Sequence, residues 1–319
     1  MIYNSSMEKI LVTGGAGFIG SHLCEYLLNK GYKVVCLDNL VTGSKKNIEP
    51  LLGNPNFEFI EADVCKLPDH ISNQQISHIF DLASPASPID FEKLSEEILT
   101  VNSIGVLKLL ELAKNTKAKF LMASTSEVYG DPKENPQKET YWGNVNSFGR
   151  RSCYDEGKRF SEAACHVFLN KYDVDLRVVR IFNTYGPRMR TDDGRALITF
   201  VMEAIKNEPF TVFGDGSQTR SFCYVSDMVE GLYKAMFTEG TKGEVFNLGN
   251  PEEYSMNDLV AKIKEMTGAP SEIVYKDLAA DDPKQRRPDI AKAERYLNWK
   301  PQVSVTEGLQ KTIEYYKSL

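Results

Sequence analysis

The chain has 319 residues, 42% of them hydrophobic and 26% charged, with a formal net charge of -6. A chain of this length can bury a large α/β core or the cores of two lobes. The acidic balance excludes a general nucleic-acid-binding protein, because such proteins need a strongly basic surface. No run approaches the roughly 18 apolar residues that suggest a membrane-spanning helix, and residues 1–6 lack the basic and apolar regions of a signal peptide.

The cysteines and histidines further narrow the class of protein to which the chain can belong. The six cysteines lie far apart without a C-x-x-C motif, and none of the four histidines has metal-ligand spacing with another. Scattered thiols in a chain of this size are typical of a reducing compartment. We therefore expect no bound metal and a cytoplasmic location.

Short apolar runs alternate with helical patterns through the first half of the chain. Strands are predicted at residues 9–13, 33–38, 57–61, 78–83, 119–124 and 177–182, and helices at residues 21–30 and 98–114. Strands that alternate with helices form right-handed βαβ units, so this order predicts an α/β fold with a Rossmann-type, doubly wound parallel sheet. The functional groups of such a sheet gather at the carboxyl ends of its strands.

The pattern changes after residue 183. Residues 183–195 form a polar loop that is too long for a simple connector, and such loops tend to be functional. A helix at 196–206, strands at 211–213 and 244–248, and a helix at 257–267 follow. We assign residues 7–183 and 226–252 to the sheet domain, and residues 184–225 and 253–319 to a smaller C-terminal lobe that binds the substrate.

Three glycines, Gly14, Gly17 and Gly20, follow the first strand and precede a helix. A turn without side chains lets backbone amides approach a pyrophosphate, and the helix N-terminus adds positive potential. Asp38 ends the second strand about 20 residues further on, where a carboxylate binds the adenosine ribose and repels a 2′-phosphate. The pattern predicts a dinucleotide site that prefers NAD to NADP.

A second motif, formed by Tyr154 and Lys158, has the spacing Y-x-x-x-K. Residues four apart on a helix lie on one face, so the ammonium lies beside the phenol. A nearby cation stabilises phenolate and lowers a pKa that is about 10 in free tyrosine. Such a tyrosine can take a hydroxyl proton while hydride leaves the same carbon. The pair also follows a hydroxyl-rich strand end at residues 124–127, so we expect oxidation of an alcohol.

Several longer motifs occur in order along the chain. They are GGAGFIG (14–20), LASPASP (82–88), STSEVYGDP (124–132), CYDEGKR (153–159), FNTYGPRM (182–189), GSQTRSFCYVSD (216–227) and RRPDI (286–290). With these motifs the chain resembles the extended short-chain dehydrogenase/reductase family and, within it, most closely the UDP-glucuronate decarboxylases. The resemblance extends from about residue 9 to about residue 301.

The resemblance implies a reaction that begins and ends with the same tightly held NAD. Tyr154 takes the proton of the sugar 4-hydroxyl while hydride passes to NAD, and the resulting 4-ketone lies β to the C6 carboxylate. Carbon dioxide then leaves because the electrons of the broken bond enter an enolate, which Tyr154 and Thr125 stabilise. After protonation at C5 the hydride returns to C4, and UDP-xylose is released.

The resemblance also implies roles for single residues around the sugar. Thr125 hydrogen-bonds the 4-oxygen, and Lys158 also holds the nicotinamide ribose. Ser126 and Glu127 face the carboxylate end of the sugar. Two roles for Glu127 stay open, because it could disfavour the charged ground state or relay the proton to C5.

Other contacts of the two ligands are carried over motif by motif. Arg286 positions the substrate, with the adjacent Arg287 as the alternative. The cofactor site comprises Gly14, Gly17, Phe18, Ile19, Gly20, Asp38, Asn39, Asp63, Val64, Leu82, Ala83, Ser84, Tyr154 and Lys158. The nucleotide-sugar site comprises Pro85, Glu127, Asn183, Arg188, Thr211, Phe213, Arg220 and Arg286, with Asn183 and Arg220 at the diphosphate and residues 211–213 along the uracil. Plain surface charge is the alternative for Arg188 and Arg190.

Relatives with the same scaffold provide competing interpretations. Sugar-nucleotide 4,6-dehydratases need an acid to expel the C6 hydroxyl, and Ser126 stands where their aspartate would lie. A UDP-glucuronate 4-epimerase must let the keto sugar rotate, which a sequence does not show, so it is the second enzyme hypothesis. A catalytically silent NAD-bound regulatory module is the hypothesis from another class, and the intact Tyr154 and Lys158 count against it.

The resemblance finally implies a homodimer. Relatives pair through two helices from each subunit to form a four-helix bundle, which corresponds here to residues 98–114 and 154–171. Self-complementary twofold contacts suit this arrangement. The expected partners are therefore a UDP-sugar and a second copy of the chain, without nucleic acid or membrane.

Overall fold

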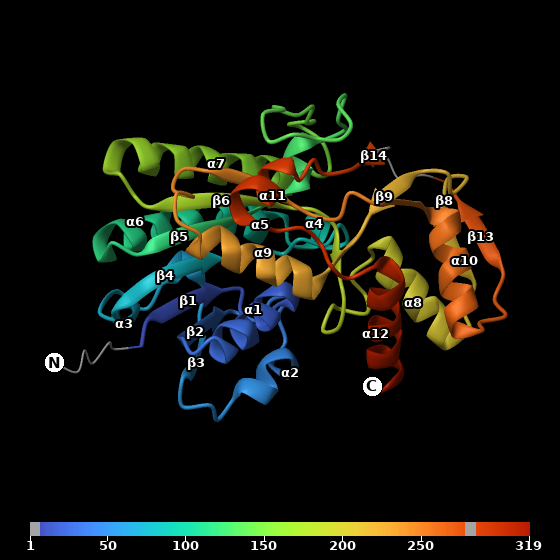
Figure 1. Ribbon diagram of the computed structural model, residues 1–319, viewed down its shortest axis with the longest axis horizontal. Helices are drawn as coiled ribbons and strands as arrows, with labels where there is room; N and C mark the ends of the chain where they lie inside the picture. The colour runs from blue at the N-terminus through green and yellow to red at the C-terminus, as the bar shows by residue number, and fades with distance from the viewer. Residues whose placement is uncertain (1–6, 278–284) are drawn as a thin grey trace.

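The computed structural model describes residues 7–277 and 285–319, so the expectation for residues 1–6 and part of the assigned lobe lie outside the described residues. Seven parallel strands form one sheet with the order β3-β2-β1-β4-β5-β6-β11 (Figure 1). They are β1 (Lys9–Thr13), β2 (Lys33–Asp38), β3 (Phe57–Glu61), β4 (Ile76–Asp81), β5 (Lys119–Thr125), β6 (Leu176–Ile181) and β11 (Val245–Leu248). This order confirms the predicted α/β fold with a Rossmann-type, doubly wound parallel sheet.

Helices cover both faces of this sheet and build most of the smaller lobe. Those in the described residues are α1 (Phe18–Asn29), α2 (Lys45–Ile48), α3 (Asp69–Ser72), α4 (Asp90–Lys93), α5 (Ser95–Thr100), α6 (Val106–Thr116), α7 (Ser152–Tyr172), α8 (Ala196–Lys206), α9 (Val225–Phe237), α10 (Met256–Thr267), α11 (Ala291–Leu297) and α12 (Val305–Lys317). None of them is long and apolar enough to cross a lipid bilayer.

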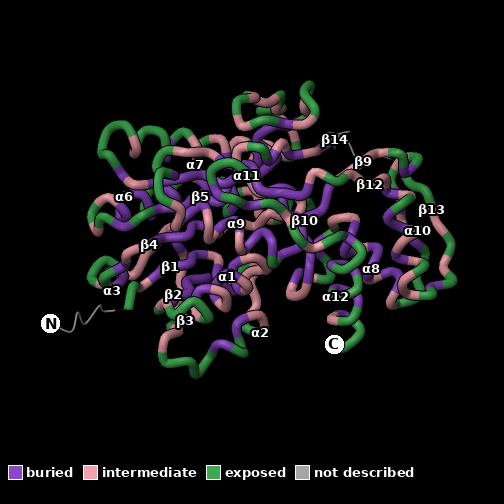
Figure 2. Tube along the Cα trace, in the orientation of Figure 1, coloured by how far each residue is buried: buried purple, intermediate pink, exposed green. Residues whose placement is uncertain are grey.

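Alternate residues of each strand face opposite sides of the sheet. On β1, Ile10 and Val12 belong to the core that includes α1 and α9, whereas Leu11 belongs to the core that includes α6 and α7. Because both faces are buried there, β1 and β2 are continuous apolar runs rather than alternating ones. Figure 2 shows this part of the chain as largely buried.

The smaller lobe contains short sheets beside α8, α10 and α12, to the right of the large sheet in Figure 1. Its strands are β7 (Thr184–Tyr185), β8 (Phe210–Phe213), β9 (Thr219–Ser221), β10 (Cys223–Tyr224), β12 (Glu253–Ser255), β13 (Ile273–Lys276) and β14 (Gln285–Arg286). The chain then returns to the sheet domain, because α11 packs against β11 and α9, and Trp299 Nε1 donates to Asp227 O at 2.9 Å. Residues 291–299 therefore lie against the sheet, although the sequence assignment placed all of 253–319 in the lobe.

Several boundaries differ from the predicted ones by a few residues. β4 begins at Ile76, two residues before the predicted start, and α1 begins at Phe18 because Gly17 is its N-cap. The predicted helix at 98–114 is interrupted by a π-helical turn over Val101–Gly105. A Cβ on Gly105 would lie 2.9 Å from Val64 Cγ2. This turn therefore packs closely against Val64, in the segment that follows β3. Such turns are frequent at functional sites.

Candidate active site

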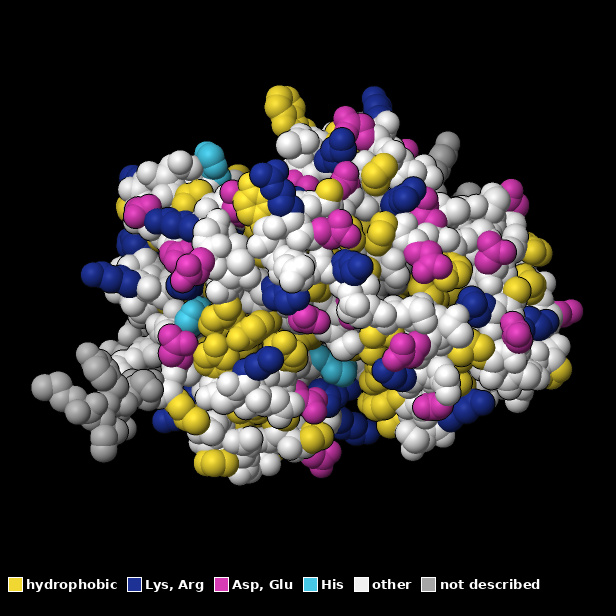
Figure 3. All heavy atoms as spheres, viewed as in Figure 1, with side chains coloured by type: hydrophobic (Ala, Val, Ile, Leu, Met, Phe, Trp, Pro, Cys, Tyr) yellow, Lys and Arg dark blue, Asp and Glu magenta, His cyan; other side chains and the backbone are white. Residues whose placement is uncertain are grey.

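A cleft of about 1350 Å³ lies between the carboxyl ends of the strands and the smaller lobe, and Figure 3 shows Lys and Arg side chains in the hollow between these parts. Many of the predicted site residues line it: Gly17, Phe18, Ile19, Gly20, Leu82, Ser84, Thr125, Ser126, Glu127, Tyr154, Lys158, Asn183, Arg188, Thr211, Phe213, Arg220 and Arg286. Seven others lie outside its lining: Gly14, Asp38, Asn39, Asp63, Val64, Ala83 and Pro85. The fold thus brings residues far apart in the sequence to one cavity.

The glycine loop forms one end of this cleft. Gly14 has a φ of +67°, and a Cβ there would lie 2.6 Å from Leu82 O. A Cβ on Gly20 would lie 2.1 Å from Gly14 O, so only glycine lets helix α1 approach the turn so closely. Gly17 caps α1 without a side-chain hydrogen bond, and the first turn of α1 contains no acidic residue. The amides and positive end of this helix are therefore suited to an anion such as a pyrophosphate.

Asp38 holds the glycine loop in place. Its carboxylate accepts hydrogen bonds from Ala16 N at 3.0 Å and from Leu40 N at 2.8 Å. Burial raises the pKa of Asp38, and these backbone hydrogen bonds oppose that shift. Asp63 is similarly engaged as an N-cap, because its Oδ1 accepts from Cys65 N at 2.8 Å. The predicted cofactor contacts of these two residues stay predictions.

Tyr154 and Lys158 lie on the buried face of α7, four residues apart as predicted. The Tyr154 ring stacks on Phe91 with ring centroids 5.1 Å apart. Burial raises the pKa of Tyr154 to about 12, although a hydrogen bond from Thr125 acts in the opposite direction. The Lys158 ammonium donates to Ala123 O at 2.9 Å, and the predicted lowering of the phenol pKa by Lys158 stays a prediction.

Lys158 has a buried counter-charge that the sequence analysis missed. Burial lowers the pKa of Lys158, and the charge of Asp81 at the end of β4 opposes the shift. Asp81 is itself fixed by a hydrogen bond from Thr13 Oγ1 at 2.9 Å. Its position at a strand end, beside the tip of the first strand, is the only signal the sequence offers. The charge of Asp81 thus favours the ionised form of the buried Lys158 ammonium.

Glu127 is the centre of a set of charged groups beside Tyr154. It pairs with Arg286 through both carboxylate oxygens, one of them at 3.0 Å, and with Arg151 at 2.6 Å. Burial alone would raise the pKa of Glu127, but the charges of Arg286 and Arg151 hold it at about 2. Asp155 completes the set, with its Oδ2 4.0 Å from Arg151 Nε. We call Glu127, Arg151, Asp155 and Arg286 the arginine–carboxylate cluster.

The cluster also decides between the two adjacent arginines. The Arg286 side chain is 4% exposed and bonded to Glu127, whereas the Arg287 side chain is 42% exposed and lies 3.7 Å from Glu253. Arg287 follows the end of β14 and is not part of the cleft lining. The structure places Arg286 there, and the sequence could not make this choice.

Two residues that the sequence analysis did not single out belong to the site. Arg151 is the N-cap residue of α7, three residues before Tyr154, a spacing that could have revealed it. Arg195 lines the cleft, is held by Asp193 at 2.6 Å, and its charge lowers the pKa of Tyr154. Arg195 therefore supplies cationic influence on the phenol in this structure.

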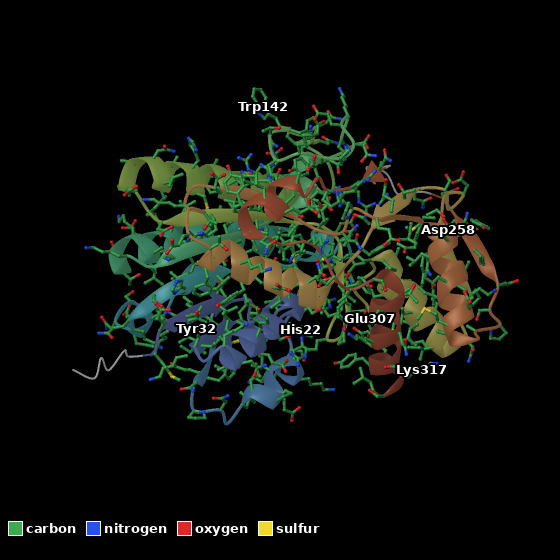
Figure 4. All side chains as sticks on the ribbon, in the orientation of Figure 1. His22, Tyr32, Trp142, Asp258, Glu307 and Lys317 are labelled. Carbon is green, nitrogen blue, oxygen red and sulfur yellow. The ribbon has the colours of Figure 1, made fainter. Side chains whose placement is uncertain are left out.

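Arg188 and Arg190 tie the long loop down and are not plain surface charges. Arg188 pairs with Glu25 of α1 at 2.5 Å, and Arg190 pairs with Asp90 at 2.9 Å. His22, which Figure 4 places on α1 near the smaller lobe, also contacts Pro187 O at 3.0 Å. These contacts connect the loop to the sheet domain across the cleft.

The lobe side of the cleft carries the residues assigned to the nucleotide. Thr211 and Phe213 lie on β8, and Arg220 lies on β9, in register with Arg286 on the parallel β14. Phe213 is 48% exposed although it is apolar, so its ring is open to a ligand. Asn183 lies just after β6 at the cleft wall. Thr211, Phe213 and Arg220 thus reach the cleft from the lobe, and Asn183 reaches it from the end of β6.

Comparison with known proteins places this site in a family. Residues 11–312 match the model of the GDP-mannose 4,6 dehydratase family. UDP-glucuronic acid decarboxylase 1 from Arabidopsis thaliana is 49% identical over 97% of the chain and 70% of its own length. Its namesake from Xenopus tropicalis is 48% identical over 97% of the chain and 72% of its own length. The chain belongs to the UDP-glucuronic acid decarboxylase family.

Solved structures agree with the assignment to these decarboxylases and their relatives. UDP-glucuronic acid 4-epimerase from Bacillus cereus, in complex with UDP-glucuronic acid and NAD, is 34% identical with a TM-score of 0.90. The similarity covers 97% of the chain and 99% of the epimerase. UDP-glucuronic acid decarboxylases are NAD-dependent, and the uncapped N-terminus of α1 beside glycines with no room for a Cβ fits a dinucleotide.

Within residues 7–277 and 285–319, no group of three His, Cys, Asp or Glu side chains could hold a metal ion. All six cysteines are free thiols.

Proposed function

We propose that the chain is an NAD-dependent carboxy-lyase that converts UDP-glucuronate to UDP-xylose and carbon dioxide. The observation that supports this most is the position of two arginines, Arg151 and Arg286, beside Tyr154 and Thr125 in one cleft. A base for the sugar hydroxyl and cations for the sugar carboxylate are both needed for this reaction. The names of the curated relatives agree with it.

The residues divide the proposed reaction between them. When bound, NAD supplies the hydride acceptor and donor for sugar C4, and its cationic nicotinamide favours phenolate. Tyr154 takes the proton of the 4-hydroxyl at its phenol oxygen, and Thr125 orients that oxygen. The C5–C6 bond then breaks, its electrons enter the enolate of the 4-ketone, and carbon dioxide leaves. A proton adds to C5, and Tyr154 returns its proton to the 4-oxygen as hydride returns to C4.

Glu127 acts in this scheme as the counter-charge that fixes the two arginines. A carboxyl with a pKa of about 2 is ionised at neutral pH, so it holds no proton for C5 in this arrangement. Its bidentate contact with Arg286 fixes the plane of the guanidinium. The sequence left two roles open for Glu127, which were relay of the proton to C5 and repulsion of the charged ground state. The geometry favours a third role instead, in which Glu127 orients its cationic partners.

NAD binding by this chain has a direct test in Gly20→Ala. The added Cβ would lie 2.1 Å from the backbone oxygen of Gly14, which no side-chain rotation can relieve. We expect NAD affinity to fall at least tenfold, with a loss of about 1–3 kcal/mol of stability from overpacking. Isothermal titration with NAD measures the first quantity and urea unfolding the second.

Gly31→Ala is the matched control for this change. Gly31 follows the same helix and has a φ of +87°, but nothing lies within 4 Å of an added Cβ. It should lose about 1–2 kcal/mol of stability from backbone strain and keep its NAD affinity. Equal NAD affinities for Gly20→Ala and the parent would contradict the proposed cofactor site.

The second candidate function is UDP-glucuronate 4-epimerase. It is favoured by the high structural similarity to the Bacillus cereus enzyme. Incubation with UDP-glucuronate labelled at C6, with and without added NAD, separates the two. Release of labelled carbon dioxide with formation of UDP-xylose supports the decarboxylase, whereas a C4 epimer that retains the label supports the epimerase. The intact Tyr154 and Lys158 leave little support for a silent regulatory module.

We further infer that the chain forms a homodimer through α5, α6 and α7. Five large apolar side chains on these helices and the π-turn between them are 38–51% exposed: Leu99, Ile104, Leu107, Phe160 and Val167. The helices pack on one another through Ser161 Oγ, which donates to Asn102 O at 2.7 Å. A second copy that covers this face would bury the apolar side chains and complete a four-helix bundle. The predicted cytoplasmic location likewise stays a proposal.

Ile104→Asp tests this dimer. A carboxylate at the centre of an apolar interface costs several kcal/mol, so we expect a monomer at micromolar concentration, as measured by analytical ultracentrifugation. Leu52→Asp is the control, because Leu52 is 50% exposed on the connection before β3, far from these helices in the sequence. If both variants sediment like the parent, this interface is not the one used.

A further inference from the structure

Asp155 is a buried carboxyl group that the proposed reaction does not use. It follows Tyr154 directly on α7 and is 5% exposed. One of its oxygens, Oδ1, is fully buried without a hydrogen-bond partner, and the other lies 4.0 Å from Arg151 Nε. A buried carboxylate with so few partners is costly, so the neutral form is favoured.

The surrounding charges explain this arrangement. Arg151 at the N-cap of α7, Glu156 on α7, Glu127 on η4 (Ser126–Tyr129) and Arg286 on β14 act on Asp155. Glu127 pairs with Arg151 at 2.6 Å and also with Arg286. Asp155 makes only the longer, weaker contact with Arg151. Burial and the negative charge of Glu127 raise the pKa of Asp155 to about 7.

The charge of the arginine–carboxylate cluster therefore depends on Asp155. Ionisation of Asp155 makes the charge of the cluster one unit more negative. The neutral form of Asp155 therefore favours a substrate carboxylate beside Arg151 and Arg286, and the ionised form disfavours it. Ionised Asp155 also raises the pKa of Tyr154, which disfavours the base.

We propose that Asp155 is a positioning residue that sets the charge of the arginine–carboxylate cluster, and thereby the pH range in which the cleft prefers an anionic sugar over a neutral one. This inference rests on the proposed function, because the anionic sugar is UDP-glucuronate. Asp155 acts through Arg151 and Glu127 and touches neither the sugar nor the cofactor in this scheme. The protonation state of the Asp155 carboxyl group thus sets the preference of the cleft for an anionic sugar over a neutral one.

The test compares two ligands that differ at C6. Dissociation constants of UDP-glucuronate and of UDP-glucose, which lacks the carboxylate, are measured at pH 6 and pH 8.5 with NAD-loaded protein. In the parent, the preference for UDP-glucuronate should fall about tenfold or more over this range, because the neutral fraction of a group falls tenfold per pH unit above its pKa. In Asp155→Asn the preference should stay constant within about twofold.

Controls separate this proposal from structural effects and from the proposed function. Asp173→Asn changes an exposed aspartate at the end of the same helix and should keep the parental pH profile. Asp155→Ser is a second neutral replacement if Asp155→Asn does not fold. An unchanged pH dependence in a folded neutral variant overturns the role of Asp155. If the parent releases no carbon dioxide from UDP-glucuronate, the proposed function itself fails, whatever the Asp155 variants do.

Discussion

Replacing Tyr154 with phenylalanine should leave NAD binding intact and reduce UDP-xylose formation about 10³-fold. General base catalysis is worth about 10²–10⁴-fold, and the phenol oxygen is the group that takes the 4-hydroxyl proton in the proposed scheme. The ring itself stays stacked on Phe91, since phenylalanine keeps the stacking surface. Initial rates of carbon dioxide release and titration with NAD measure the two quantities on the same preparation.

Tyr296→Phe is the matched control for this variant. Tyr296 lies on α11, stacks edge-on against Phe246 and lies outside the cleft lining. Its activity should equal that of the parent. Normal turnover by Tyr154→Phe would refute Tyr154 as the base, whereas loss of NAD binding would show that the phenol is needed for the cofactor site instead.

Glu127→Ala should have the second-largest effect, on stability and activity together. It leaves Arg286, 4% exposed, and Arg151, 17% exposed, facing each other without their shared counter-charge. Removing one member of a buried charge pair costs about 3–5 kcal/mol, and we expect a loss of about 3 kcal/mol because Arg151 can still approach Asp155. Urea unfolding measures the loss, and decarboxylation should fall at least about 100-fold.

A double variant separates the two effects. Glu127→Ala with Arg286→Met removes both charges, so much of the lost stability should return, whereas activity should stay low because the cation is gone. Glu111→Ala is the control, since Glu111 pairs with Lys114 on the surface with 48% of its side chain exposed. It should change stability by no more than about 0.5 kcal/mol. Full activity in the double variant would contradict the role of the cluster.

The contribution of Glu127 to the free energy of unfolding also depends on pH in a defined way. Its pKa falls from an ordinary 4.5 to about 2, because the arginine charges outweigh burial. A depressed pKa stabilises the folded state above the unfolded value and loses that contribution as the pH falls through the folded value. The stability difference between the parent and Glu127→Ala should therefore shrink between about pH 4.5 and pH 2. A constant difference over this interval would show that Glu127 is not ionised in the folded protein.

Sequence reasoning recovered the framework because that framework is local. The runs at 9–13, 33–38 and 57–61 have the observed bounds, and the first two are continuous apolar strands because both faces of the sheet are buried there. Gly14, Gly17 and Gly20 predicted an anion-binding turn from backbone requirements alone. The helices α9, α11 and α12 were not predicted as elements, and α11 packs against β11 and α9 although residues 253–319 were assigned to the lobe.

The ionisation states could not be predicted in this way. The spacing of Tyr154 and Lys158 indicated a lowered phenol pKa, yet burial dominates and raises it to about 12. The ammonium is directed to Ala123 and Asp81, which come from strands distant in sequence. Burial and the orientation of a guanidinium depend on every element that packs around them, so no local pattern contains this information.

By itself, then, the sequence determined the parallel sheet, the glycine turn at its edge and the helix that carries Tyr154 and Lys158, because each follows from the chemistry of neighbouring residues. Only the tertiary structure decided that Arg286 rather than Arg287 faces the cleft, that Arg151 shares Glu127 with it, and that Asp155 is left with a single weak contact. The residues of these contacts come from η4, β14 and α7 with its N-cap. Their electrostatic energies depend on distances and burial, which are defined only once these elements have packed together.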